Sequence, residues 1–162
     1  HITNKIVKES LENKQLTELR EYNLIRPEKK FGNNTRFDFL LYNSKKDKKA
    51  FLEVKSVTLS RKNGHAEFPD SVTSRGKKHL ENLVIANNQG YDSYLMFLVQ
   101  VENCESFGIA SDIDPEYFKT FKETTKNNIK VLCYDCKFSS KGIKLNKQIK
   151  LKINERRDSR IV

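Results

Sequence analysis

The sequence has few cysteines and no long apolar segment, and each shortage excludes a class of protein. Its 162 residues include only three cysteines, an odd number that argues against a disulfide framework and for a reducing compartment. No stretch approaches the roughly 18 apolar residues of a membrane span. Lys5, Lys8 and Glu9 interrupt the N-terminal segment where a signal peptide would need an apolar region. We therefore expect a cytoplasmic protein with no membrane partner.

Internal repeats and Pro- or Ser-rich linkers are also missing from the sequence. The length is that of one ordinary domain, and a chain of this size can bury about two-thirds of its unfolded surface without disulfide bonds. We predict a single domain over residues 1–154. Residues 155–162 form a basic tail that we expect to be frayed.

The charge is strongly one-sided. Lys and Arg number 31 and Asp and Glu 21, so the formal net charge is +10. Such an excess favours a polyanionic partner, most simply nucleic acid. Because the basic residues are spread along the chain, solubility conferred by lysine explains the excess equally well.

Two of the cysteines, Cys133 and Cys136, form a C-x-x-C motif that occurs in zinc and redox sites. Their surroundings predict a β-strand, and residues three apart on a strand point to opposite faces. No second cysteine pair or nearby histidine completes a zinc site. The pattern therefore disfavours both functions.

Hydrophobic periodicity predicts an α/β fold around a mixed sheet. The expected helices are 3–22, with a break near Asn13, 71–89 and 115–127; Asp114 caps the last and Pro115 takes its first turn. The expected strands are 35–42, with Phe37, Phe39 and Leu41 on one face, 50–59, 93–101 and 129–138, followed by a turn and a short final strand pair.

Asp38, Glu53 and Lys55 are the residues most suited to chemistry. Glu53 and Lys55 are two apart on a strand and share a face, and Asp38 lies on the adjoining strand. Asp and Glu are the hard oxygen ligands that Mg²⁺ or Mn²⁺ takes in phosphodiester hydrolysis, and a lysine can hold the attacking water or stabilise charge on phosphorus. On spacing alone, an ordinary ion pair on a solvated sheet face, contributing about 0–1 kcal/mol, is the commoner explanation.

Three segments, Arg36–Leu41, Phe51–Leu59 and Phe68–Leu80, resemble in order the sugar fermentation stimulation protein A (SfsA) family. The resemblance extends to about Leu151. It implies a DNA-binding protein linked to the control of sugar genes, maltose in particular. It also implies the PD-(D/E)XK fold, a restriction-endonuclease-like mixed β-sheet flanked by helices.

The resemblance also assigns residues. Asp38, Glu53 and Lys55 match the family's catalytic set, and a metal would be held by Asp38 and Glu53 with Glu18 from the first helix. Phe37 replaces the proline of the "PD" name. The family carries an N-terminal OB-like domain, and we expect this chain to begin beyond it. The residues expected at nucleic acid are Arg36, Thr73, Arg75, Lys77, Lys78 and His79.

Two functional hypotheses follow. The first is a DNA-binding protein with a Mg²⁺-dependent phosphodiesterase (nuclease) site. The second is a non-catalytic DNA-binding transcriptional regulator of sugar (maltose) metabolism genes. Neither implies a small-molecule cofactor, and a basic protein that adheres to nucleic acid without a defined site is a third alternative. His79 also suits a structural hydrogen bond, and Gln100, at the end of a buried strand, suits a metal edge or a satisfied core amide.

Overall fold

The computed structural model describes residues 2–153, so the tail predicted over 155–162 lies outside the described residues. No helix within 2–153 is long and apolar enough to cross a membrane. The elements are, in chain order, α1 (Ile2–Glu12), the 3₁₀ helix η1 (Thr17–Leu19), β1 (Leu24–Phe31), β2 (Thr35–Asn43), β3 (Lys48–Val57), β4 (Leu59–Lys62), β5 (His65–Phe68), α2 (Ser74–Asn88), β6 (Asp92–Val99), β7 (Ser106–Ile109), α3 (Pro115–Thr125), β8 (Lys130–Ser139), β9 (Gly142–Gln148) and β10 (Lys150–Leu151).

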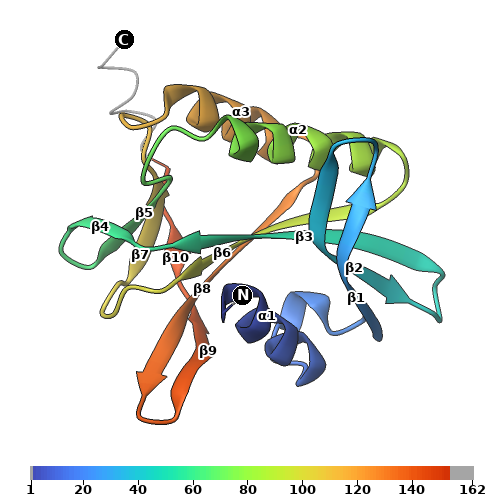
Figure 1. The fold of residues 1–162 in the computed structure, drawn as a ribbon, viewed down its shortest axis with the longest axis horizontal. Helices are drawn as coiled ribbons and strands as arrows, with labels where there is room; N and C mark the ends of the chain where they lie inside the picture. The colour runs from blue at the N-terminus through green and yellow to red at the C-terminus, as the bar shows by residue number, and fades with distance from the viewer. Residues whose placement is uncertain (1, 154–162) are drawn as a thin grey trace.

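The main sheet has six strands in the order β1-β2-β3-β6-β8-β9. The central pairs β3–β6 and β6–β8 are parallel, whereas the outer pairs are antiparallel. Parallel neighbours require crossover connections, and here α2 lies between β3 and β6 and α3 between β6 and β8. A smaller sheet, β10-β7-β5-β4, lies beside it (Figure 1).

Helices cover both faces of the main sheet, α1 on one and α2 with α3 on the other (Figure 1). Under α1, Ile6 and Val7 pack in one buried cluster with Phe39 and Leu41 of β2. The second buried cluster joins the opposite face to α2, α3 and the smaller sheet; among its members are Leu80, Leu83, Phe97, Phe107 and Phe121. The predicted α/β architecture with a mixed sheet flanked by helices is therefore confirmed.

The ends of several elements differ from the prediction. The first helix ends at Glu12, and Lys14 takes the left-handed conformation (φ 60°) before η1. The strand predicted over 50–59 ends at Val57, and the chain then enters β4 of the smaller sheet. The final strands do not pair with each other, because β9 pairs with β8 and β10 with β7. Strand β7 was not predicted, since its short run is stabilised only by distant partners.

The N-termini of α2 and α3 are joined by hydrogen bonds. Thr73 caps α2 by accepting from the Gly76 N–H, and its own N–H donates to the Asp114 carboxylate at 2.8 Å. Asp114 in turn caps α3 through the Tyr117 N–H at 3.0 Å, as predicted for the Asp114–Pro115 pair. This arrangement fixes the start of α2 against α3.

We expect Gly76→Ala to lower the free energy of unfolding by about 1–3 kcal/mol, because an added Cβ would lie 2.8 Å from Thr73 Cγ2 and 3.2 Å from Tyr117 Cε2. The effect opposes the helix propensity of alanine, which alone would add about 1 kcal/mol. Urea unfolding followed by circular dichroism measures it. Glu81→Ala on the exposed side of α2 is the control and should change stability by less than about 0.5 kcal/mol. A Gly76→Ala protein as stable as the wild type would contradict the packing described.

Candidate functional site

The site lies where β2 separates from β3. The last paired residues are Phe39 and Leu52. Beyond this pair, the side chain of Asp38 replaces the backbone of β2 as a hydrogen-bond partner of β3. Its Oδ2 accepts from the Val54 N–H at 2.7 Å. The Asp38 N–H donates to Glu53 Oε1 at 3.3 Å. From the neighbouring helix α1, Asn4 Nδ2 donates to Asp38 Oδ1 at 2.9 Å.

Beyond Phe39, where β2 no longer pairs with β3, the buried side chains of β2 do not all pack in one cluster. Phe39 and Leu41 share one face, as predicted, and pack under α1, but Phe37 packs in the cluster on the α2 side. The prediction that the three share one face was therefore wrong for Phe37. Strict alternation fails here because β2 is no longer held flat against β3 beyond Phe39.

Glu53 is buried, with 3% of its surface exposed. Its Oε2 lies 3.2 Å from Lys55 Nζ and 2.5 Å from His79 Nδ1, and His79 Nδ1 lies 2.9 Å from the same Lys55 Nζ. Lys55 is itself only 13% exposed. The alternative of an ion pair on a solvated face therefore does not hold, and the three predicted residues Asp38, Glu53 and Lys55 come together.

The two neighbouring carboxyl groups have divergent pKa values. Burial raises the pKa of Asp38, and the charge of Glu53 raises it further, to about 7, against the hydrogen bonds from Val54 and Asn4. Burial acts to raise the pKa of Glu53 as well, but the hydrogen bond with His79, the charge of Lys55 and the contact with Asp38 outweigh it and lower the pKa to about 2. Near neutral pH, Glu53 is ionised and Asp38 is partly protonated.

A metal ion at this site would need carboxylate oxygens that can converge on one point. Residues 2–153 contain no cluster of three or more His, Cys, Asp or Glu side chains with the geometry of a metal site. Mg²⁺, however, is commonly held by one or two carboxylates together with waters and substrate phosphate. Asp38 and Glu53 supply two carboxylates whose mutual repulsion a divalent cation would relieve, so the donor set fits such an ion.

Glu18 is not part of this site, contrary to the prediction. Its Oε1 accepts from the Tyr134 hydroxyl at 2.6 Å and its Oε2 from Gln148 Nε2 at 2.7 Å. Those partners belong to β8 and β9, which β6 separates from β3. Because the first helix ends at Glu12, it is Asn4 that reaches the site, and no motif in the sequence indicated it.

A cleft of about 670 Å³ opens between the β1–β2 turn and the start of α2. Its lining contains four lysine or arginine side chains and no aspartate or glutamate. The predicted residues Arg36, Arg75, Lys78 and His79 all line it, and His79 also contacts Glu53. The cleft therefore adjoins the Asp38–Glu53 site. The complete lining is Lys30, Asn33, Asn34, Thr35, Arg36, Ser74, Arg75, Lys78 and His79.

Two residues predicted to contact nucleic acid lie elsewhere. Thr73 caps α2 with its hydroxyl. Lys77 forms an ion pair with Glu116 of α3 at 3.3 Å, on the side of α2 away from the cleft lining. Lys30 of β1, which the sequence analysis did not single out, also lines the cleft.

The remaining polar candidates have structural surroundings. Gln100 Nε2 donates to Thr3 Oγ1 at 2.9 Å and to Ser56 Oγ at 2.7 Å. Cys133 and Cys136 pack in the two clusters on opposite faces of the sheet, as predicted. Burial raises the pKa of each thiol to about 12, so neither is suited to metal or redox chemistry.

The solved structure of Pyrococcus furiosus SfsA in complex with Ca²⁺ has the same fold. The TM-score is 0.85 at 24% sequence identity, and the alignment covers 94% of this chain and 64% of that one. At this identity the comparison establishes the fold alone.

Curated relatives are closer in sequence. The sugar fermentation stimulation protein homolog of Pelagibacter ubique is 46% identical over 93% of this chain, and that of Roseobacter denitrificans is 40% identical over 94%. This chain spans 64% of the length of each of these relatives. The family model described as the sugar fermentation stimulation protein RE domain matches residues 1–142. The chain belongs to the sugar fermentation stimulation protein family.

Proposed function

We propose that this chain binds DNA in the basic cleft and carries a divalent-metal-dependent phosphodiesterase (nuclease) site at Asp38, Glu53 and Lys55. The observation that carries the proposal is the position of the cleft. His79 belongs both to its lining and to the Glu53–Lys55 cluster. A phosphate backbone held by the cleft would therefore lie next to the two carboxylates.

The cleft suits DNA because of its charge. Lys30, Arg36, Arg75 and Lys78 concentrate positive charge on a surface without carboxylates. Side chains of this kind bind phosphates and release condensed counterions. The start of α2 adds the partial positive charge of a helix N-terminus. A DNA partner also agrees with the expected cytoplasmic location.

Asp38 and Glu53 would hold Mg²⁺ or Mn²⁺. Such an ion, when bound, neutralises a phosphate oxygen and lowers the pKa of a bound water. The Pyrococcus relative was solved in complex with Ca²⁺, which also takes oxygen ligands and therefore supports a hard-cation site in this family.

The protein's own residues supply the remaining roles. Lys55, held by Glu53 and His79, places its ammonium where it can orient a water or stabilise the charge that develops on phosphorus. His79 fixes the Glu53 carboxylate from α2 and is a positioning residue in this arrangement. Asn4 and the Val54 N–H do the same for Asp38.

Two observations favour the regulator hypothesis as a second candidate. Glu53 Oε2 is already occupied by Lys55 and His79, and residues 2–153 contain no complete three-ligand metal cluster. A domain that had kept its cleft but lost turnover would retain DNA binding and act as a non-catalytic transcriptional regulator.

The double variant Arg75→Ala/Lys78→Ala should bind double-stranded DNA at least about tenfold more weakly than the wild type at 0.1 M salt, with a shallower dependence of affinity on salt. The loss should be similar for unrelated sequences, because phosphate contacts carry no base information. Fluorescence anisotropy over a salt series measures both quantities. Lys77→Ala is the control: it removes one positive charge from the same helix outside the cleft, half of the charge that the double variant removes, and should change affinity less than about twofold. Equal losses in the double variant and the control would reject the cleft as the binding surface.

Lys55→Met should abolish metal-dependent DNA cleavage, with a rate loss of at least about 10²-fold, while DNA affinity stays within about twofold. Methionine keeps the apolar stem and removes only the ammonium. Cleavage and binding are measured on the same preparations, with Mg²⁺ or Mn²⁺ present and absent. Cleavage by Lys55→Met at the wild-type rate would reject its catalytic role. A wild type that binds DNA tightly but cleaves it in the presence of neither Mg²⁺ nor Mn²⁺ would move the assignment to the regulator.

Asp38→Asn should stabilise the metal-free protein at pH 8 by roughly 1–3 kcal/mol. Because the pKa of Asp38 is raised from 3.8 to about 7 in the folded state, the folded form binds protons more tightly than the unfolded chain. This group's contribution to stability is therefore lost as pH rises from about 4 to about 7, and the advantage of the variant should vanish at pH 4. Thermal unfolding at the two pH values tests this. Adding Mg²⁺ should stabilise the wild type and leave the stability of Asp38→Asn unchanged. If Asp38→Asn is less stable than the wild type at pH 8 without metal, the electrostatic account is wrong.

A further inference from the structure

The longest segment of the chain without an acidic residue is 136–154, between Asp135 and Glu155. Four of its lysines belong to the hairpin that β8 and β9 form, and all four are exposed. This β8–β9 hairpin therefore concentrates positive charge that no neighbour in the sequence offsets. The complete set of lysines in the segment is Lys137, Lys141, Lys144, Lys147, Lys150 and Lys152.

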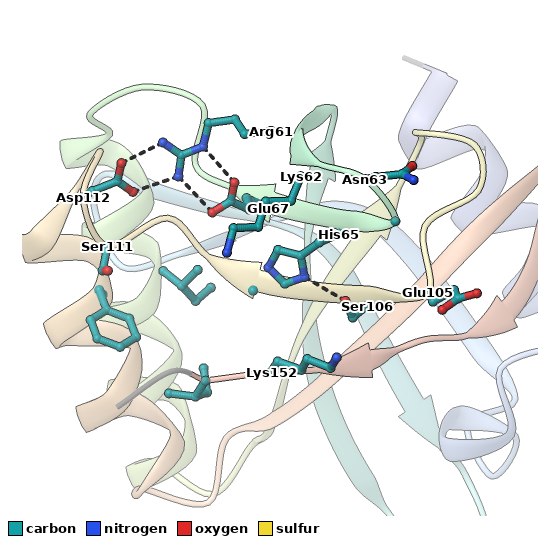
Figure 2. Close-up of a pocket in the computed structure, with 15 residues that line it drawn as sticks. Arg61, Lys62, Asn63, His65, Glu67, Glu105, Ser106, Ser111, Asp112 and Lys152 are labelled. Atoms are coloured by element: carbon teal, nitrogen blue, oxygen red, sulfur yellow. Dashed lines mark hydrogen bonds and ion pairs between the residues drawn. The ribbon is translucent and has the colours of Figure 1, made fainter. Parts of the chain in front are cut away.

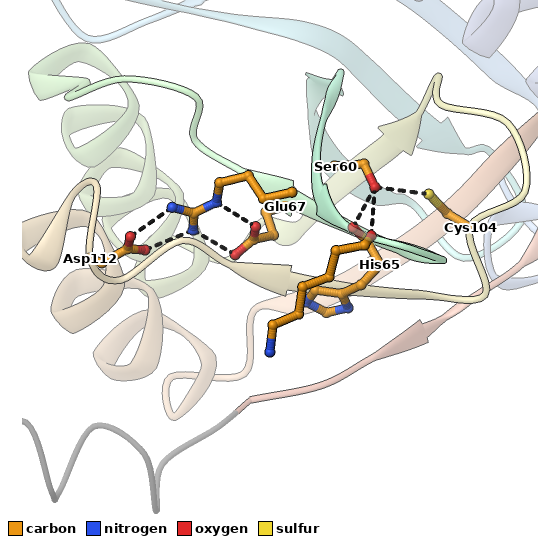
Figure 3. A network of polar contacts seen from close by, with 7 residues as sticks. Ser60, His65, Glu67, Cys104 and Asp112 are labelled. Carbon is orange, nitrogen blue, oxygen red and sulfur yellow. Dashed lines mark hydrogen bonds and ion pairs between the residues drawn. The ribbon is translucent and has the colours of Figure 1, made fainter.

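Other basic parts of the surface are balanced by acids. The pocket of about 410 Å³ over the smaller sheet has three acids and three lysine or arginine side chains in its lining (Figure 2). Within it, Arg61 donates to the carboxylates of Glu67 and Asp112 at 2.7–2.9 Å (Figure 3). Lys48 likewise pairs with Asp92 at 3.0 Å. Solubility accounts for mixed surfaces of this kind, and they do not select an anion.

The lysines of the β8–β9 hairpin lack such compensation. Within residues 2–153 none of the four ammonium groups has a hydrogen bond or an ion pair. Asp135 is buried, and its Oδ1 accepts from the backbone N–H of Lys147 at 2.9 Å. Glu9 of α1 borders Lys144 across a cavity of about 50 Å³, but in the described part of the chain the two form no ion pair.

Two of these lysines face each other. Lys137 and Lys144 are directly opposite in the antiparallel pairing of β8 with β9. Their neighbours Cys136 and Leu145 are buried in the cluster under α1, so both lysines lie on the other face of the hairpin. Like charges in directly opposite positions destabilise a strand pair, whereas an acid at either position would stabilise it. The fold therefore keeps a repulsion that a bound polyanion would relieve.

The hairpin extends the edge of the sheet at which the candidate site lies. Val57 at the end of β3 pairs with Val99 of β6, and Val99 pairs with Asp135 of β8. Beyond Asp135, β8 therefore continues past the C-terminal ends of both other parallel strands. Figure 1 shows the hairpin projecting there, away from α2 and α3.

The hairpin is also close enough to the site for one DNA molecule to reach both. Lys55 pairs with Phe97, which pairs with Cys133, and Lys137 is four residues further along β8. Two strand spacings across and four residues along separate the Cα atoms of Lys55 and Lys137 by roughly 16 Å. That distance corresponds to about five base-pair steps of a duplex. Val57 and Cys133 pack in the same cluster, so the two lysines lie on the same side of the sheet.

We propose that the β8–β9 hairpin is a second contact surface for the phosphate backbone of DNA, with Lys137 and Lys144 as its main contacts and Lys141 at its tip. The inference rests on the proposed function, because the DNA is the molecule held in the basic cleft. The hairpin shares no residue with the lining of that cleft. A lysine ammonium contacts phosphate as a point charge, so the contacts add affinity without selecting a sequence.

The first test compares two variants that lose the same charge. Lys137→Gln/Lys144→Gln should bind a duplex of about 30 base pairs at least about tenfold more weakly at about 0.1 M salt, and its slope of log affinity against log salt should be about 1.8 smaller. Lys45→Gln/Lys46→Gln, in the exposed turn between β2 and β3, should leave the slope unchanged. Fluorescence anisotropy over a salt series measures both. Equal losses in the two variants would mean that only net charge matters and would overturn the proposal.

The second test separates binding from folding. Lys144→Glu replaces the like-charge pair with an opposite-charge pair, so the free protein should unfold at a higher urea concentration than the wild type. The same variant should bind DNA more weakly than Lys137→Gln/Lys144→Gln. A residue with a merely structural role would not gain stability while losing DNA. Lys144→Glu with wild-type DNA affinity would overturn the proposal.

The third test locates the contact directly. Bound DNA should slow the acetylation of Lys137 and Lys144, measured by mass spectrometry, and leave Lys45 and Lys46 at their free rates. Vesicles of phosphatidylserine and phosphatidylcholine are the comparison. Protection by the vesicles and not by DNA would assign the hairpin to a membrane surface and overturn the proposal.

The outcomes for the hairpin and for the basic cleft can be told apart. If Arg75→Ala/Lys78→Ala loses affinity and Lys137→Gln/Lys144→Gln does not, the proposed function stands and the hairpin contact is wrong. The reverse result keeps the hairpin contact and rejects the cleft. A wild type that binds no DNA rejects both.

Discussion

The buried carboxylate of Glu53 is the constraint on which the site depends. A charge removed from water must be compensated locally, and here the compensation comes from Lys55, His79 and the Asp38 N–H. His79 arrives from α2, so the helix must start at a fixed place above β3. The caps formed by Thr73 and Asp114 fix that place by joining α2 to α3.

The separation of β2 from β3 is the second half of the same arrangement. A continuous ladder would satisfy the Val54 N–H with a backbone carbonyl and leave no position for an acid between the strands. Here the Asp38 carboxylate accepts that hydrogen bond instead, and it lies beside Glu53 as a result. Two adjacent acids with pKa values moved in opposite directions are costly to a fold and useful to a metal-dependent reaction.

Helix α2 connects the basic cleft with the Asp38–Glu53 site. Arg75 and Lys78 line the cleft from its first turns, and His79, the residue after Lys78, contacts Glu53. Lys77 points to α3 instead and pairs with Glu116. Neighbouring basic residues in one segment of sequence therefore differ in role, because the 100° rotation per residue of a helix directs them to different surroundings. The smaller sheet, with the Arg61 ion pairs, builds a separate pocket.

Local sequence was enough to predict the alternation of strands and helices, the caps at Asp114 and Pro115, the opposite faces of Cys133 and Cys136, and the shared strand face of Glu53 and Lys55. These follow from local periodicity and from residue types whose conformational preferences act over a few positions. Tertiary structure decided the rest. Whether Glu53 was buried, whether Glu18 or Asn4 reached Asp38, which face Phe37 took and which lysines of α2 lined the cleft all depended on contacts between residues far apart in the chain. Local sequence carries no record of such contacts, because the partner that satisfies a buried charge or a free N–H is supplied by another element of the fold.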